Sequence, residues 1–583
     1  PAYHTLGINY LRTGREEEGR DFLEKSFERD PFNVWVANTQ KLLSHMDKNH
    51  KEYATENFRF HFPSEDFEVL KHFLVPLVEE AYTKLSKHYR VKLDPPIYVD
   101  VFSNHNWFSA KITGLGGFPA TGACFGNVVA LTTPKALPQN WGAVAWHEFA
   151  HVVTLAATKN QIPRWLTEGL SVFEEGRDRP LWSRNFTREI ADAYGSGRLL
   201  PLRELDSGFS KPKYRMQVLI SYFQGCLIVD YIDEKWDFDK VLAILDGYAE
   251  KKSTTQIFDE VFGITLEEFD KGFFAWLDAW VKKNGYQSQL APETVPLLEI
   301  EAQEKPKDVA VLTKLAWAYF CNAEYEDVPI TLEKAFAVDA DYADAHAIMG
   351  LSLQRQKKGA EAKTHYEKAL EKGTKYEYRV REALGVLAAA GGKNDEAIKQ
   401  FAKAKEVSPL AGAGYPPGRN LYYRLSSLYK EAGDVEKAMQ VMEELRVFGV
   451  EDSRCRKILA DHYSELGTPE GDEKALTALE ESLFIQPFDP AVHKKIARLA
   501  TKVKKHETVV REYELLLGYP DTNPRAAYVA LAKSYFALGK KEEAKTYAKK
   551  VLKIDEEHEA ALEILKKLEA DEGDAEKKPA TDG

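Results

Sequence analysis

A short pattern of small and apolar residues recurs along the second half of this 583-residue chain. Each copy starts with a bulky residue that is followed by a small one, and another small residue often lies twelve positions further on. Successive copies are about 34 to 41 residues apart, with one further degenerate copy, which contains Ala475 and Pro487, between Ser426 and Ala497. The starting pairs are Leu315-Ala316, Met349-Gly350, Leu384-Gly385, Leu425-Ser426, Ile496-Ala497 and Leu531-Ala532. This period predicts stacked pairs of antiparallel helices, with the small residues where the helices approach closely.

The pattern resembles the tetratricopeptide repeat over about residues 305–568, which predicts about seven helical pairs. Leu6 and Gly7 show similar offsets to the residues that follow them and indicate one more helical unit within residues 1–50. Arrays of this kind imply a protein or peptide partner that binds the repeats. A helical bundle without a true repeat is the alternative interpretation.

Residues 53–285 have a different character, with strand patterns first and helix patterns afterwards. Residues 58–62 alternate between apolar and polar side chains, and residues 96–102 and 126–133 have the composition of buried strands. Helical spacing then prevails from Trp141 onwards. Strands followed by helices predict an α+β domain, which contains a mixed sheet and a helical subdomain and is flanked by all-α repeats.

Two further segments have the composition of connections rather than of packed structure. Residues 286–304 contain Pro292 and Pro296 and are expected to link the α+β domain to the repeats. The charged segment 569–583 is expected to be a disordered tail, because it offers few apolar groups to bury.

Charge and hydropathy exclude two classes of function. The formal net charge is −12 and both signs are interspersed, so the chain has no basic stripe of the kind that binds nucleic acid. No apolar run approaches the roughly 18 residues that cross a bilayer, so no membrane span is expected. The four cysteines form no CxxC pair, and they indicate neither a disulfide framework nor a cysteine metal site.

The first residues of the chain bear on its location. The chain starts with Pro1, and the residues after it already have the pattern of a helical repeat. We interpret the chain as a fragment or processed form, from which any signal peptide would be missing. The compartment is therefore undetermined, and a bacterial periplasmic, secreted or membrane-tethered location is favoured over a cytoplasmic one.

One helical segment carries a candidate metal site. Residues 141–158 are apolar almost all round, which predicts a buried helix. This segment contains the sequence His147-Glu148-Phe149-Ala150-His151. Positions i and i+4 share one helix face, so both imidazoles can bind one zinc ion, with Glu148 beside the water that the ion would hold. A chance occurrence of this short motif is the alternative.

A third ligand is expected from the next helix. After a turn, Pro163 starts the segment Pro-Arg-Trp-Leu-Thr-Glu-Gly-Leu, in which Glu168 lies seventeen residues beyond His151. Two helices joined by a short turn run antiparallel, which brings Glu168 back towards the histidine pair. Two histidines, one glutamate and an open fourth position are typical of a catalytic zinc ion and not of a structural one.

The HExxH helix followed by PxWLxEGL resembles the gluzincin peptidases, and most of all the bacterial peptidase MA-like domains that are often fused to tetratricopeptide repeats. The resemblance covers about residues 53–285 and implies a thermolysin-like fold. It implies that His147, His151 and Glu168 bind one zinc ion and that Glu148 is the general base. It also implies that Tyr222 stabilises the oxyanion, although a core aromatic on an amphipathic helix is an equal alternative.

Gluzincins bind peptides along an edge strand, and residues 126–133 resemble that strand. An ordinary core strand is the alternative. The expected substrate-binding residues are Gly126, Asn127, Val128, Val129 and Ala130. Aminopeptidases of this clan have a glutamate near this strand, and residues 122–127 contain none. The chain is therefore expected to be a zinc-dependent endopeptidase and not an aminopeptidase, with repeats that bind a protein partner. The main alternative is a catalytically inactive peptidase fold that serves as an interaction scaffold.

Overall fold

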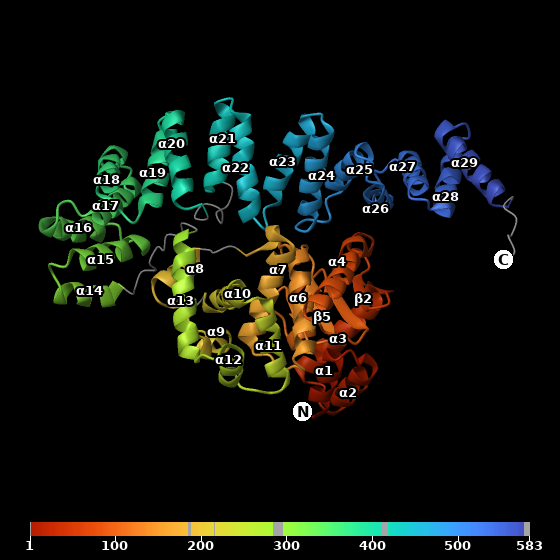
Figure 1. The fold of residues 1–583 in the computed structure, drawn as a ribbon, viewed down its shortest axis with the longest axis horizontal. Helices are drawn as coiled ribbons and strands as arrows, with labels where there is room; N and C mark the ends of the chain where they lie inside the picture. The colour runs from red at the N-terminus through yellow and green to blue at the C-terminus, as the bar shows by residue number, and fades with distance from the viewer. Residues whose placement is uncertain (1, 185–187, 215, 284–294, 410–417, 577–583) are drawn as a thin grey trace. The chain divides into compact units, whose positions relative to one another are not determined.

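The computed structural model of the chain describes residues 2–184, 188–214, 216–283, 295–409 and 418–576 (Figure 1). Helices predominate in these residues, and the strands form one small mixed sheet. The chain divides into two compact units, of which the first joins residues 1–160 to residues 451–583 and the second contains residues 161–450.

The sheet of the first unit has the strand order β1-β2-β3-β5-β4. The strands are β1 (His50–Ala54), β2 (Phe58–Pro63), β3 (Ile97–Phe102), β4 (Gly122–Cys124) and β5 (Val128–Thr132). β2, β3 and β5 are parallel neighbours, and the outer strands β1 and β4 pair antiparallel to them. The alternation in β2 buries Phe58, Phe60 and Phe62, as the sequence pattern predicted.

The predicted edge strand is not at the edge. β5 is hydrogen-bonded to β3 on one side and to β4 on the other, so the prediction that residues 126–133 form the edge is wrong. The edge on this side of the sheet is β4, whose three residues are too few to show an alternating pattern in the sequence. Strand order is a non-local property, and a buried apolar strand has the same local pattern at the centre of a sheet as beside its edge.

Helices cover the sheet of the first unit. They are α3 (Val34–Asn49), α4 (Phe67–His88), α5 (His105–Thr113) and α6 (Trp141–Ala157). α6 packs against α4, β4 and β5, and almost all of its residues are buried. It begins at a cap in which Asn140 Oδ1 accepts a hydrogen bond of 3.0 Å from the Ala143 amide.

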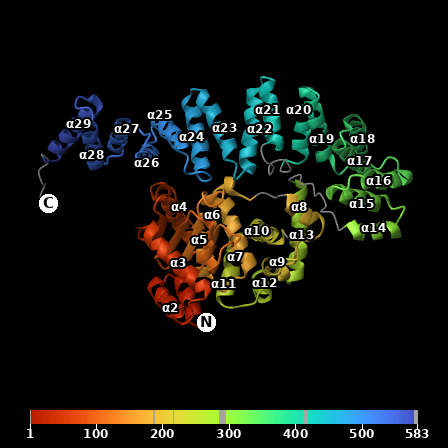
Figure 2. The same ribbon diagram turned by 180° about the vertical axis from the view of Figure 1, so that it is seen from behind.

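Helical pairs complete the first unit (Figures 1 and 2). The N-terminal pair is α1 (Ala2–Arg12) and α2 (Glu16–Arg29). The C-terminal helices are α23 (Ser453–Glu465), α24 (Pro469–Leu483), α25 (Pro490–Lys502), α26 (His506–Leu516), α27 (Pro524–Ala537), α28 (Lys541–Leu552) and α29 (Glu559–Glu576). Of these helices, α24 contacts the start of α6, since the Trp141 indole donates a hydrogen bond of 3.0 Å to the Leu483 carbonyl.

Part of the predicted disordered tail is helical. α29 continues to Glu576, because the residues after 569 still include alanine and glutamate, which favour helices. Residues 577–583 lie outside the described part of the chain.

The second unit begins with a helical subdomain. Its helices are α7 (Arg164–Asp178), η1 (Pro180–Trp182), α8 (Arg188–Gly195), η2 (Leu202–Glu204), α9 (Leu205–Ser210), α10 (Gln217–Trp236), α11 (Phe238–Ala249), α12 (Thr254–Phe262) and α13 (Leu266–Lys283). In the expected linker 286–304, residues 286–294 lie outside the described part, and the rest is the helix α14 (Val295–Glu304). Val295 and Leu298 bury one face of α14 in the core of the repeats.

The repeats of the second unit are antiparallel pairs of helices. They are α15 (Val309–Cys321) with α16 (Asp327–Val338), α17 (Ala343–Arg355) with α18 (Gly359–Lys372), α19 (Glu377–Ala390) with α20 (Asn394–Val407), and α21 (Leu421–Glu431) with α22 (Val435–Phe448). The small residues lie at the helix crossings, where the Ser426 hydroxyl donates a hydrogen bond of 3.0 Å to the Ala438 carbonyl.

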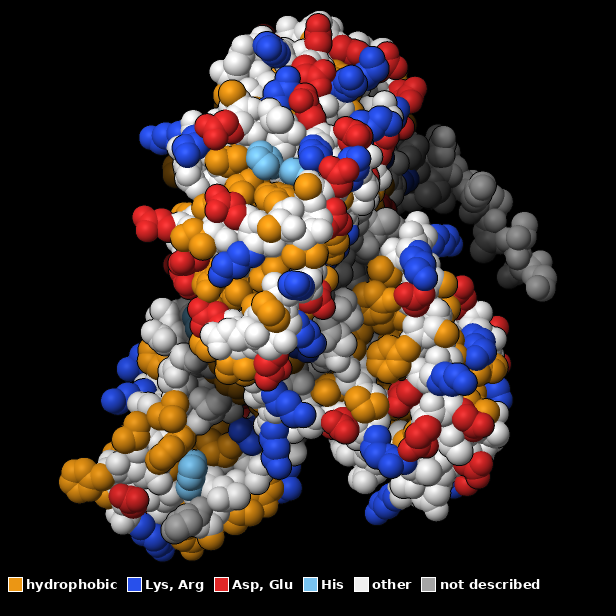
Figure 3. Space-filling model, turned by 90° about the vertical axis from the view of Figure 1, so that its left-hand side faces the viewer, with side chains coloured by type: hydrophobic (Ala, Val, Ile, Leu, Met, Phe, Trp, Pro, Cys, Tyr) orange, Lys and Arg blue, Asp and Glu red, His pale blue; other side chains and the backbone are white. Residues whose placement is uncertain are grey.

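The surface carries charges of both signs. Figure 3 shows lysine, arginine, aspartate and glutamate side chains mixed with hydrophobic ones over the face that it displays. Throughout the described residues, every helix is too short or too polar to cross a lipid bilayer.

Candidate metal centre

Two histidines on α6 face the same side of the helix. His147 and His151 are four residues apart, and their ring centroids are separated by 4.8 Å with the rings almost perpendicular. Only 6% of His147 and 9% of His151 is exposed. A buried apolar helix thus places two imidazoles together, as the i and i+4 spacing predicted.

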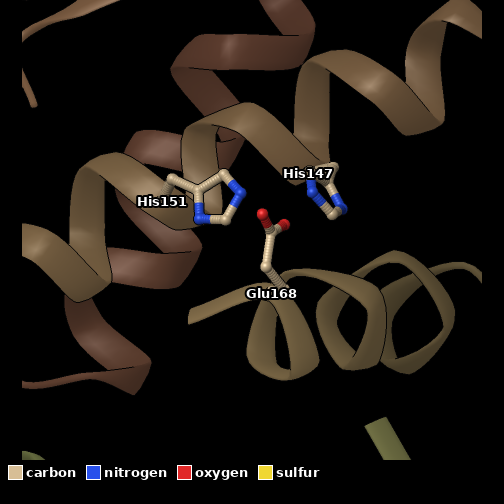
Figure 4. Close-up of side chains that lie close together, drawn as sticks. All are labelled: His147, His151 and Glu168. Atoms are coloured by element: carbon tan, nitrogen blue, oxygen red, sulfur yellow. The ribbon is translucent and has the colours of Figure 1, made fainter. Parts of the chain in front are cut away.

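Glu168 on α7 completes a set of three donors. One imidazole nitrogen from each histidine and one carboxylate oxygen of Glu168 all lie within 4.8 Å of one another. Figure 4 shows both rings and the carboxylate directed towards one point. Two nitrogens and one oxygen are a donor set of catalytic zinc sites, in which tetrahedral ligands at about 2.0–2.1 Å lie about 3.4 Å apart. Small side-chain adjustments bring the three residues to that spacing, so the residues present fit a zinc ion.

Glu148 follows His147 on α6 and contacts the sheet edge. Only 6% of Glu148 is exposed, and its carboxylate lies against Gly122 of β4. A Cβ atom added at Gly122 would be 2.5 Å from Glu148 Oε1 and 2.6 Å from its Cγ. Because Gly122 has no side chain, the side chain of Glu148 fits between α6 and the sheet edge.

The close packing of α7 against α10 positions Tyr222. α7 and α10 meet where Gly169 faces Gly225, and a Cβ atom on Gly169 would lie 2.5 Å from the Gly225 carbonyl carbon. At this crossing the Tyr222 hydroxyl donates a hydrogen bond of 3.1 Å to Glu168 Oε1. The tyrosine that the sequence singled out thus contacts a predicted metal ligand.

Two arginines that were not predicted to belong to the site flank Glu168 and Tyr222. Arg164 Nε lies 3.3 Å from Glu168 Oε1, and the Arg184 guanidinium carbon lies 5.8 Å from the centroid of the Tyr222 ring. Arg184 pairs with both oxygens of the buried Glu175, at 3.0 and 2.8 Å. The sequence contains one indication that Arg164 belongs to the site, because it is a basic residue one turn before Glu168. It contains no such indication for Arg184.

The predicted substrate strand has an internal position. Val128, Val129 and Ala130 are buried. Val129 and Ala130 pair with β3 on one side and with β4 on the other, so they offer no edge to an added peptide strand. Gly126 and Asn127 precede β5 and are partly exposed. Their role in substrate binding stays a prediction.

The repeats of the second unit contain a separate pocket. It has a volume of about 260 Å³ and lies between α19, α20 and α21. Its walls are mostly apolar, with one arginine and one glutamate at the same site. The lining residues are Val386, Ala389, Phe401, Arg424, Ser427, Leu428 and Glu431.

Comparison with protein families confirms the two resemblances in their broad form. Residues 78–279 match the Peptidase MA superfamily. Residues 1–33, 420–445 and 526–558 match the tetratricopeptide repeat. The chain therefore contains a Peptidase MA superfamily domain together with tetratricopeptide repeats.

Individual relatives are distant. Over 201 residues the chain is 20% identical to anaphase-promoting complex subunit 3 of Schizosaccharomyces pombe, and this alignment covers 34% of the chain. The chain spans only 29% of the length of that relative.

The similar solved structures include repeat proteins. YrrB, a TPR protein with an unusual peptide-binding site, is 20% identical at a TM-score of 0.26, with 37% of this chain and 100% of YrrB covered. A tetratricopeptide repeat protein from Parabacteroides merdae is 17% identical at a TM-score of 0.24, and the match covers 45% of this chain and 98% of that protein. The APC/C hetero-tetramer Cut9–Hcn1 is 12% identical at a TM-score of 0.24, and the match covers 91% of this chain and 96% of the matched chain.

Proposed function

We propose that this chain, which combines a Peptidase MA superfamily domain with tetratricopeptide repeats, is a zinc-dependent metallopeptidase of the gluzincin type. The observation that carries the proposal is the convergence of His147, His151 and Glu168, with Glu148 on the same helix as the two histidines. A zinc ion bound by these three residues would supply a bound water with a pKa lowered to about 7 and would polarise the scissile carbonyl. A thermolysin-like fold of residues 53–285 is part of the proposal.

Glu148 is the general base in this proposal. Its carboxylate takes a proton from the attacking water and returns it to the leaving amine. Burial against Gly122 supports this role, because a carboxylate with one well-defined position can transfer a proton in both directions.

Tyr222 is the proposed oxyanion donor. Its hydroxyl contacts Glu168 and therefore lies at the metal centre, where a donor can stabilise the negative charge that develops on the carbonyl oxygen. The hydrogen bond to Glu168 also orients the carboxylate, so removal of the hydroxyl tests both effects.

The substrate is proposed to be an extended peptide. β4 pairs with β5 and lies at the end of the strand order, and its Gly122 contacts Glu148, so a peptide added to β4 would pass the general base. Residues 122–127 contain no carboxylate that could bind a free amino terminus, which favours an endopeptidase over an aminopeptidase.

The substitution Glu148→Gln tests the mechanism. It keeps the size of the side chain and removes the base, so the purified variant should retain about one zinc ion per chain. Its cleavage of casein should fall by about 10²–10⁴-fold, the usual contribution of a general base. Glu204→Gln, an exposed change, is the control and should cleave as the unchanged protein does. Cleavage by Glu148→Gln at the unchanged rate would overturn the mechanism.

Protein binding by the repeats is a second function, which can accompany or replace catalysis. The pocket between α19, α20 and α21 supports it, since apolar walls with one charge of each sign suit a side chain of a bound peptide. A zinc-loaded protein that cleaves neither casein nor a peptide library, yet binds a partner through the repeats, would be a scaffold and not a peptidase.

A further inference from the structure

Arg164 is a charged residue beside the metal centre, and the proposed mechanism does not use it. It is the first residue of α7 and lies one turn before Glu168. Its side chain is 54% exposed, whereas that of Glu168 is only 9% exposed. The guanidinium thus lies on the solvent side of the carboxylate, where a substrate can reach it.

The surroundings of Arg164 limit its position. Its guanidinium carbon lies 5.3 Å from the centroid of the Phe209 ring, and Phe209 in turn packs edge-on against Tyr222 at 5.2 Å. The start of α7 is itself anchored, because Asp206 Oδ1 accepts a hydrogen bond of 2.8 Å from the Trp165 amide. Arg164 is therefore fixed next to Tyr222 and does not extend freely from a loop.

Arg164 and a divalent ion would share one carboxylate. Glu168 is the acid with which Arg164 pairs among the residues that the structure describes, at 3.3 Å. A metal ion held by Glu168 would draw on the same negative charge and weaken this pair. The carboxylates of Glu148 and Glu168 would together balance a divalent ion, whereas Glu175 already balances Arg184. Within this group of side chains, the charge of Arg164 is then left to be balanced by a bound molecule.

We infer that Arg164 recognises a carboxylate of the peptide substrate. This inference rests on the proposed peptidase function and adds the class of substrate. A guanidinium presents parallel N–H donors that match both oxygens of a carboxylate. The carboxylate can be an acidic side chain near the cleaved bond or the carboxyl terminus of a short peptide, and both have the same chemistry.

Arg184 serves as the internal comparison. It has the same charge and also lies beside Tyr222, but both oxygens of Glu175 already hold it. Its guanidinium is therefore occupied in a way that metal binding at Glu168 does not change. The structure assigns recognition to Arg164 and a structural role to Arg184.

Peptide binding tests the inference separately from catalysis. Zinc-loaded Glu148→Gln protein is titrated with two matched pairs of peptides, one pair with a carboxyl or an amide terminus and one with an internal glutamate or glutamine. We expect the carboxylate member of one pair to bind about tenfold more tightly or better, as a hydrogen bond between charged groups should. The pair that shows the preference identifies the source of the carboxylate.

Substitutions then assign the preference to one residue. Arg164→Gln in the same protein should abolish the preference and leave zinc content and binding of the neutral peptide unchanged. Arg203→Gln is the matched control, since Arg203 is 63% exposed and pairs with the exposed Glu267. It should keep the full preference.

Each remaining outcome is decisive. Equal binding of all four peptides, a preference that survives Arg164→Gln, or loss of zinc from that variant would overturn the inference, the last because Arg164 would then only position Glu168. Casein cleavage by the unsubstituted protein tests the peptidase function separately. Cleavage without any carboxylate preference refutes the inference alone, whereas an Arg164-dependent preference without cleavage refutes the peptidase function and supports carboxylate binding.

Discussion

Gly169 and Gly225 bring α7 and α10 into backbone contact, and a Cβ atom on Gly225 would lie only 2.7 Å from the Trp165 carbonyl oxygen. Glu168 precedes one of these glycines, and Tyr222 lies one turn before the other. The distance between the helix axes therefore sets the hydrogen bond between Tyr222 and Glu168.

Gly169→Ala should separate the two helices. The added methyl group meets backbone atoms, which cannot move aside, so we expect the free energy of unfolding to fall by about 1–3 kcal/mol or more. Zinc affinity should fall as well, because Glu168 moves with α7. Urea unfolding and a zinc titration measure the two effects. Gly418→Ala is the control, since its added methyl group would meet nothing within 4 Å, and equal stability of both variants would refute this account.

Tyr222→Phe should reduce kcat/KM by about 10²–10³-fold, the usual effect of removing one oxyanion donor. Loss of the hydrogen bond to Glu168 should also lower the free energy of unfolding by about 0.5–1.5 kcal/mol. Kinetics on a fluorogenic peptide and thermal unfolding separate the two effects. Tyr214→Phe removes a hydroxyl elsewhere in the same subdomain and should leave kcat/KM unchanged. Normal catalysis by Tyr222→Phe would show that its hydroxyl serves only to orient Glu168.

Gly122→Ala should displace Glu148 while the zinc ligands stay in place. The new methyl group would overlap both the carboxylate and the Cγ of Glu148, so the whole side chain must move. A displacement of about 1 Å can reduce a rate by about 10²-fold. Zinc content and casein cleavage are the measurements. At Gly116 an added Cβ would meet Asn106 Oδ1 at an ordinary 3.4 Å, so Gly116→Ala should keep full activity, and equal activity of both variants would contradict the placement of Glu148.

Asp230 should make the protein less stable as the pH rises. Burial, together with the nearby Asp233 and Glu234, raises the pKa of Asp230 in the folded state to about 7. In the unfolded chain this pKa is about 3.9, so the folded state binds more protons between these values and stability falls as the pH increases from about 4 to 7. Asp230→Asn should remove this loss and be more stable by about 1–3 kcal/mol at pH 8.

Thermal unfolding at pH 5 and pH 8 checks this prediction. The difference in melting temperature between Asp230→Asn and the unchanged protein should be small at pH 5 and larger at pH 8. For Asp246→Asn, a change of an exposed aspartate, the difference in melting temperature from the unchanged protein should be the same at pH 5 and pH 8. A gain for Asp230→Asn that does not depend on pH would refute the titration of this carboxyl.

Patterns of short range predicted much of the molecule. The spacing of Ser426 and Ala438 predicted a helix crossing, and the structure joins them by a hydrogen bond. The positions of His147 and His151 on one helix face follow from the 3.6-residue period alone. The prediction of Glu168 as the third ligand required only one further assumption, a short turn between two antiparallel helices. Glu168 does lie close to the two histidines.

Contacts between segments that are far apart in the chain could not be predicted from the sequence. Nothing near Val129 and Ala130 shows that the three-residue strand β4 pairs with their outer side, which is why the predicted edge strand is internal. The positions of Gly122 beside Glu148 and of Arg184 beside Tyr222 depend on the packing of elements that are far apart in the chain.

By itself, the sequence determined the longer helices, the central strands and the residue types that they carry, because helix and strand periods, caps and repeat spacing act over a few residues. Only the tertiary structure decided the order of the strands, the backbone contact at Gly169 and Gly225, and the pairing of Arg164 with Glu168 instead of another acid. These features depend on which surfaces pack together, and that is set by the burial of the whole core and not by any local run of residues.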